Sequence, residues 1–139
     1  MIGTWKGKYK YNVNKSSELY NKEVEFLLKI TEFDGENFTG TVQDNDHEYG
    51  TRGVGTVRGK INNNGIEFIK QMPVKTMVSI NGKRTENENE KHTPIYYTGI
   101  SNLKDSYTGN WKIKCGSFIN KLLYFLFGVK GIWEITKIE

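Results

Sequence analysis

Apolar and polar residues alternate along much of the chain, which is the pattern of strands with one buried and one exposed face. In residues 5–11, aromatic rings and a glycine occupy one set of positions and three lysines the other. The same period of two, or a short apolar run, predicts further strands at 24–30, 38–43, 51–61, 66–72, 74–80, 93–100, 106–115 and 131–138. Residues 83–91 are almost wholly polar and predict a surface loop.

This spacing of short strands, without a capped helix between them, predicts an all-β fold. Glycine recurs at alternate positions in 53–59, which favours the strong bending that barrel closure requires. We therefore expect a single up-and-down antiparallel β-barrel of roughly 8–10 strands. The 139 residues suit one domain, 1–139. Segment 118–129 carries the unbroken apolar run 122–127 and is expected to form a short plug or lid before the last strand.

A small motif occurs three times. Gly3-Thr-Trp5, Gly109-Asn-Trp111 and Gly131-Ile-Trp133 lie on the first and the last two predicted strands. Because the first and last strands pair in an up-and-down barrel, we expect the three tryptophans to lie close together and to plug one end.

The Gly3-x-Trp5 motif on the first strand, the meander layout and a second Gly-x-Trp near the C-terminus resemble the calycins. These are the lipocalin, fatty-acid-binding and avidin-like antiparallel barrels. In lipocalins, a basic residue on the last strand packs over the first tryptophan. Lys137 is the basic residue of the last predicted strand here. If Lys137 packs in that way, the barrel is lipocalin-like; otherwise it is avidin-like or similar to calycins in shape alone.

Composition and charge bear mainly on the compartment. Cys115 is the single cysteine, so no intrachain disulfide can form, and residues 1–10 lack the apolar run of a signal peptide. We therefore expect a cytoplasmic protein. The run 122–127 is too short for a transmembrane segment, which needs about 20 apolar residues. The net charge of +4 is a modest excess, without a basic tail or cluster.

The interior of such a barrel is the candidate binding site, because barrels of this size can hold one small ligand. Lys70 shares a strand face with Phe68 and Met72. If that face points inward, its ammonium group needs an anionic partner, either a ligand or an internal carboxylate; the alternative is that Lys70 faces outward. The aromatic residues either line a pocket or simply fill the core. The predicted ligand-binding residues are Trp5, Tyr9, Phe26, Phe38, Phe68, Lys70, Tyr97 and Trp111.

The sequence predicts no catalytic residues, no metal site and no cofactor. His47 and His92 both fall in polar loops, and Cys115 shares an apolar strand face, which favours a buried thiol. The acidic segment 44–48 lacks the glycine and the distal glutamate of a calcium loop, so we interpret it as a solvated hairpin tip.

The predicted function is the non-catalytic binding of a small amphipathic or anionic ligand in the barrel interior. The alternative is a solidly packed interaction or self-assembly module that uses segment 118–129, with a homo-oligomer formed through Leu122, Phe125 and Phe127. A nucleic-acid partner is not expected, because the alternation directs the rings inward, away from the lysines. The outer residues considered for that role are Lys6, Lys8, Lys10, Lys112 and Lys114.

Overall fold

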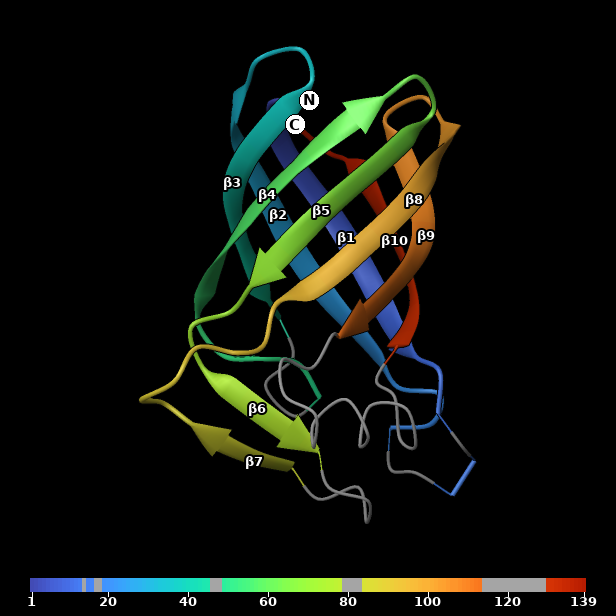
Figure 1. Ribbon diagram of the computed structural model, residues 1–139. Coiled ribbons are helices and arrows are strands. Elements are labelled where there is room, and N and C mark those ends of the chain that lie inside the picture. The colour runs from blue at the N-terminus through green and yellow to red at the C-terminus, as the bar shows by residue number, and fades with distance from the viewer. Residues whose placement is uncertain (14, 17–18, 46–48, 79–83, 114–129) are drawn as a thin grey trace.

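Eight antiparallel strands close into a barrel in the computed structural model (Figure 1). It describes residues 1–13, 15–16, 19–45, 49–78, 84–113 and 130–139. The strands are β1 (Gly3–Tyr11), β2 (Glu23–Phe33), β3 (Asn37–Asp44), β4 (Val54–Asn62), β5 (Gly65–Gln71), β6 (Lys75–Val78), β7 (Arg84–Asn87), β8 (Ile95–Leu103), β9 (Ser106–Ile113) and β10 (Lys130–Lys137).

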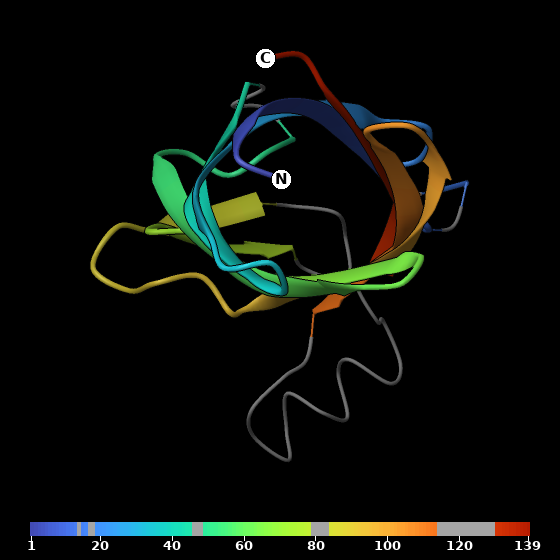
Figure 2. The ribbon, with the colours of Figure 1, turned by 90° about the horizontal axis from the view of Figure 1, so that it is seen from above.

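The strand order around the barrel is β1-β10-β9-β8-β5-β4-β3-β2, so each barrel strand pairs with its neighbours in an up-and-down meander. Seen along its axis, the barrel is a closed ring (Figure 2). Strands β6 and β7 leave the meander between β5 and β8 and form a separate two-stranded sheet. The described residues contain strands and no helices, so the predicted all-β, up-and-down barrel is confirmed.

Pairing of β1 with β10 closes the barrel. Seven residue pairs run from Trp5 opposite Lys137 to Tyr11 opposite Gly131. Backbone hydrogen bonds beyond the strand ends extend this seam: the Ile138 N–H donates to Thr4 O at 2.8 Å, and the Thr4 N–H donates to Glu139 O at 3.2 Å. Because both edges pair with each other, the backbone groups at this seam are satisfied by partners within the chain.

Two ends of the barrel differ. The β2–β3, β4–β5 and β8–β9 hairpins lie at the end where both termini lie, in the upper part of Figure 1. Strands β1, β3, β5 and β9 end at the opposite end, which we call the lower end. More residues separate each of these strands from the next barrel strand than form the upper turns.

The residues that the period of two predicts to face inward are buried in the structure. Val24, Phe26, Leu28 and Ile30 of β2 are all buried, while the residues between them are exposed. The burial of residues such as Trp5, Tyr9, Phe38 and Phe68 shows that the rings lie inside the barrel.

Aromatic rings fill the middle of the barrel. Phe68 and Tyr97 stack with centroids 4.6 Å apart, and Trp133 meets both edge-on at 5.3 and 5.5 Å. Glycine makes room for them, since a Cβ added to Gly99 would lie 2.7 Å from Trp133 Cζ2. The middle of the interior is therefore packed by the chain's own side chains.

The three tryptophans lie at different levels of the barrel, so the expectation that they plug one end is wrong. Trp5 is opposite Lys137 near the upper end, Trp133 is opposite Gly109 and Tyr9, and Trp111 is opposite Gly131 near the lower end. Spacing along each strand, which the motif does not reveal, decides these levels. What the motif shares is geometric: at Trp111 and Trp133 a glycine stands opposite the ring on the neighbouring strand.

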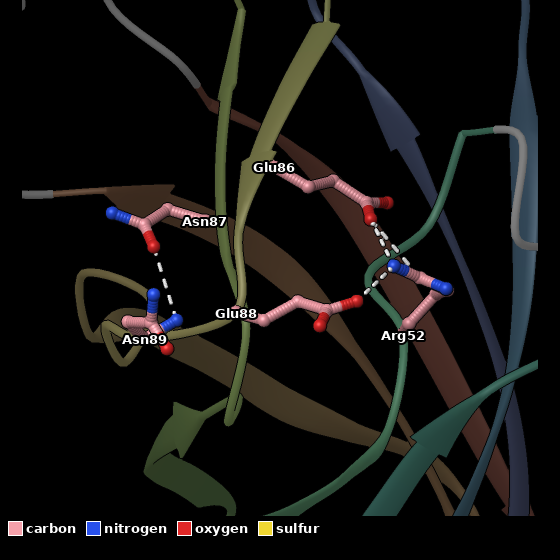
Figure 3. Close-up of polar contacts among 5 residues, drawn as sticks. All are labelled: Arg52, Glu86, Asn87, Glu88 and Asn89. Atoms are coloured by element: carbon pink, nitrogen blue, oxygen red, sulfur yellow. Dashed lines mark hydrogen bonds and ion pairs between the residues drawn. The ribbon is translucent and has the colours of Figure 1, made fainter.

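The predicted loop 83–91 is wrong in part, because residues 84–87 form β7, which pairs with β6. This strand carries almost no apolar residues, so alternation could not reveal it. Ion pairs connect it to the rest of the structure: Arg52, in the β3–β4 connection, binds Glu86 at 2.7 Å and Glu88 at 2.8 Å (Figure 3). The expectations for segment 118–129, Lys114, Cys115 and His47 fall outside the described residues.

Replacing Gly99 by alanine should lower the free energy of unfolding by about 1–3 kcal/mol, because the new methyl group would collide with the Thr108 backbone oxygen and lie 2.7 Å from the Trp133 ring. Urea denaturation measures this. The adjacent exposed Thr98→Ala is the control and should change stability by only about 0.5 kcal/mol. Equal effects of the two substitutions would contradict tight packing around Gly99.

Candidate functional site

A buried ion pair lies inside the barrel near its lower end. Asp44 is the last residue of β3, and Lys70 lies near the end of β5. Lys70 Nζ is 2.5 Å from Asp44 Oδ1, and the two side chains are 2% and 0% exposed. Such a pair is expensive to desolvate, so its surroundings decide whether both charges are tolerated.

Two more donors point to the Asp44 carboxylate. The Tyr9 hydroxyl and the Thr51 backbone N–H each donate to Asp44 Oδ2 at 2.9 Å. Together with Lys70, these bonds connect β1, β3, β5 and the β3–β4 connection at one carboxylate. Three donors to one buried carboxylate are the arrangement that makes an internal charge tolerable.

The Lys70 ammonium group also lies close to two aromatic rings. Its Nζ is 4.8 Å from the centroid of the Tyr9 ring and 5.3 Å from that of Phe26. Both distances are within the range of cation–π attraction. Tyr9 therefore contacts both members of the pair, through its ring and through its hydroxyl group.

Burial sets the protonation state of the tyrosines around this pair. Desolvation, with smaller contributions from Tyr11 and Asp44, raises the pKa of Tyr9 well above its ordinary value near 10. The pKa of Tyr97 is raised well above that value too, mainly by burial and then by the Asp44 charge. Both hydroxyl groups consequently stay protonated at neutral pH, so Tyr9 acts as a donor to Asp44.

Two aromatic residues, the half-buried Tyr11 and the buried Trp111, lie beside this pair toward the lower end of the barrel. Tyr11 packs edge-on against Trp111 with centroids 5.3 Å apart, and its hydroxyl donates to Tyr49 O at 2.7 Å. Trp111 in turn contacts Tyr9 at 5.7 Å and donates through Nε1 to Lys10 O at 3.1 Å. These rings form an apolar border around the polar cluster.

The structure places all eight predicted ligand-binding residues inside the barrel and divides them into two groups. Lys70 belongs to the ion pair, Tyr9 and Phe26 contact its ammonium group, and Trp111 contacts Tyr9. The remaining four lie higher or in the packed middle, and Trp5 contacts Tyr107 near the upper end. These four are Trp5, Phe38, Phe68 and Tyr97.

Asp44 and Thr51 are the polar residues of the site that sequence reasoning missed. Asp44 was assigned to a solvated hairpin tip, but the alternation Phe38, Gly40, Val42 continues by one more step to Asp44, which is 1% exposed. The continued alternation was the one feature of the sequence that indicated an inward-facing Asp44. Nothing in the sequence marks Thr51, because it contributes a backbone N–H. His92 was also expected in a polar loop, yet it is 7% exposed, with Nδ1 2.7 Å from Thr93 O.

The cluster has little capacity for metal binding. No group of three or more histidine, cysteine, aspartate or glutamate side chains gathers within the described ranges. The single carboxylate of Asp44 already accepts bonds from an ammonium group, a phenol and an amide. What the arrangement offers is hydrogen bonding to a polar group at a defined depth in an apolar interior.

Comparison of the chain with protein-family models, curated proteins and solved structures finds no match. In the part of the chain that the structure describes, no helix has the length and apolar character needed to cross a bilayer.

Breaking the ion pair from one side should destabilise the barrel strongly. Lys70→Met leaves Asp44 without its cation, and Asp44→Leu leaves Lys70 without its anion; each should cost about 3–5 kcal/mol of unfolding free energy. The double variant Lys70→Met/Asp44→Leu buries no charge and should recover much of that loss. Urea denaturation of the wild type, the two single variants and the double variant gives the coupling free energy between Lys70 and Asp44. Strictly additive losses of stability would contradict a coupled pair.

Stability should fall at alkaline pH through the buried tyrosines. The folded-state pKa of Tyr9 and of Tyr97 lies above the unfolded value near 10, so the folded state retains these protons longer. Their contribution is complete below about pH 10 and is lost above it, by up to about 1.4 kcal/mol per pH unit for each group. Urea denaturation between pH 8 and 11 measures the slope. It should be shallower in Tyr9→Phe, and an unchanged slope would contradict the assignment to Tyr9.

Proposed function

We propose that the protein binds a small amphipathic molecule inside the lower end of the barrel, without chemical conversion. The observation that supports this most directly is the Asp44–Lys70 pair with the Tyr9 hydroxyl, a polar cluster within an apolar interior. The polar group of the ligand meets this cluster, and its apolar part packs against the rings and aliphatic residues at the lower end.

A structural role alone accounts poorly for the ion pair. Replacing a buried pair by apolar residues of similar volume is often neutral or stabilising, so folding does not require the charges. Buried, hydrogen-bonded charges are common in binding sites, where a few polar groups orient a ligand in an apolar pocket. The position of the pair at the ends of β3 and β5, rather than in the filled middle of the barrel, supports a role in binding.

The charge balance of the cluster favours a neutral polar group over an anion. Lys70 already has the Asp44 carboxylate at 2.5 Å, so the pair carries no net charge when both groups are ionised. An anionic ligand would gain attraction from Lys70 but meet repulsion from Asp44 at nearly the same distance. A hydroxyl or amide group can donate to Asp44 and accept from Lys70 without that cost.

Apolar contacts come from the lower interior rather than from all eight predicted residues. Ile95, Trp111 and Met72 are buried and lie on strand ends, or just past them, at this end. Phe68 and Tyr97 pack against Trp133 in the middle of the barrel and form the floor of the proposed site.

The finer classification as a calycin-like barrel, located in the cytoplasm, belongs to the same proposal. Lys137 stands directly opposite Trp5 in the β1–β10 pairing, the place of the basic residue in lipocalins. That register supports the lipocalin-like form of the resemblance.

Titrating the protein with neutral and anionic amphiphiles of equal chain length, followed by tryptophan fluorescence, tests the proposal. Trp111 borders the cluster, so binding should shift the emission, and the fatty alcohol or amide should bind more tightly than the fatty acid. The variant Lys70→Met/Asp44→Leu should lose about tenfold or more in affinity, as expected when about 1.4 kcal/mol of hydrogen bonding is removed.

The matched control is Lys60→Met/Glu67→Leu, which removes an exposed ion pair of 3.3 Å on the outer wall and should bind like the wild type. If the wild-type emission stays constant across the panel, interior binding is contradicted. If the Lys70/Asp44 variant binds normally, the ligand lies elsewhere. Tyr9→Phe provides a second, milder change at the same cluster.

A further inference from the structure

The outer wall of the barrel carries a row of side chains that runs from β4 to β10. Strand register places Arg58 opposite Ile69, Ile69 opposite Tyr96, Tyr96 opposite Lys112, and Lys112 opposite Lys130. All five point away from the core: the three cations are exposed, and the two other residues are half-buried. The row crosses four strand spacings, a path of roughly 19 Å.

Shallow hollows follow this row. One of about 540 Å³ lies over β3, β4 and β5, a second of about 530 Å³ joins Arg58 to Lys112, and a third of about 370 Å³ joins Lys112 to Lys130. Tyr96 lines all three, so they form one continuous track. The described acidic residue on its lining is Glu67, which already pairs with Lys60 at 3.3 Å.

Cations of this row differ from the other outward lysines. On β1, Lys6 pairs with Glu25 at 3.9 Å, and Lys8 pairs with Glu23 and Glu134 at 3.0 and 3.2 Å. Arg58, Lys112 and Lys130 make no ion pair with any described carboxylate.

Lys112 and Lys130 in addition stand directly opposite each other. Like charges in that position destabilise a sheet, so folding alone does not explain the arrangement. A polyanion bound across the row would relieve the repulsion.

We propose that this track binds single-stranded nucleic acid, with phosphates on Arg58, Lys112 and Lys130 and bases toward Ile69 and Tyr96. Between the cations the lining is rich in groups that hydrogen-bond to sugars, phosphates and base edges, among them Thr39, Thr98 and Asn110. A basic track beside an aromatic side chain, here Tyr96, combines the two features that single-strand binding uses.

Curvature of the wall selects a single strand over other polyanions. The row spans five neighbouring strands of an eight-stranded ring, so it bends around the barrel (Figure 2). A duplex with a persistence length near 50 nm cannot follow so tight a curve, and a flat bilayer can touch only part of it. A flexible single strand can contact all three cations. This proposal departs from the expectation of no nucleic-acid partner, because the Tyr96 ring lies on the outer face among the cations.

Fluorescence anisotropy of a labelled twelve-nucleotide oligothymidylate, titrated with the wild-type chain at 50 mM salt, tests the proposal. The logarithm of the association constant should fall with the logarithm of salt concentration with a slope of about −2, as three phosphate contacts predict. The variant Arg58→Gln/Lys112→Gln/Lys130→Gln should bind at least about tenfold more weakly and lose most of that slope.

The matched control is Lys6→Gln/Lys8→Gln/Lys29→Gln, which removes the same charge from the outer faces of β1 and β2 and should bind nearly as the wild type does. Equal losses in both variants would show a non-specific effect of net charge and overturn the proposal. So would the absence of binding, tighter binding of a duplex of equal length, or binding only to vesicles containing 30% anionic lipid.

Discussion

Pairing of β1 with β10 is the contact on which the rest of the structure depends. Until these two strands meet, the meander is a twisted sheet with two open edges, and neither of its faces is an interior. The seven paired positions from Trp5 to Tyr11 close it. Closure converts a simple alternation into two environments, one dry and lined by rings, the other wet and lined by charges. Lys70 and Ile69 are neighbours on β5, yet the first is 1% exposed in the interior and the second belongs to the outer wall.

Inside, the same closure imposes a cost that the Asp44 carboxylate offsets. A lysine trapped in an apolar barrel requires a counterion, and Asp44 supplies it while accepting hydrogen bonds from Tyr9 and Thr51. The cluster therefore joins three barrel strands and one connection near the lower end. Its neutral overall charge and the packed rings beside it are the features on which the proposed recognition of a polar group on an apolar molecule rests.

Outside, the same strands carry a second set of positions under different constraints. Most lysines of β1 have carboxylates beside them, whereas Arg58, Lys112 and Lys130 follow one another around the wall without an ion-pair partner among the described residues. The interior and the outer wall are chemically independent, since successive residues of a strand belong to opposite faces. A ligand in the interior consequently does not alter the outer wall, so each of the two binding sites can be tested without the other.

The sequence by itself determined the all-β class, nearly all the barrel strands and which face of each strand is buried, because a period of two is a local property that needs no knowledge of neighbours. It also placed Lys70 among inward candidates. Only the tertiary structure decided that Asp44 is its partner, that Trp5, Trp111 and Trp133 lie at three levels, and that polar residues 84–87 form a strand. Each of these depends on register between segments far apart in the chain. Register is set by barrel closure and by cross-strand contacts, which alternation within one segment cannot encode.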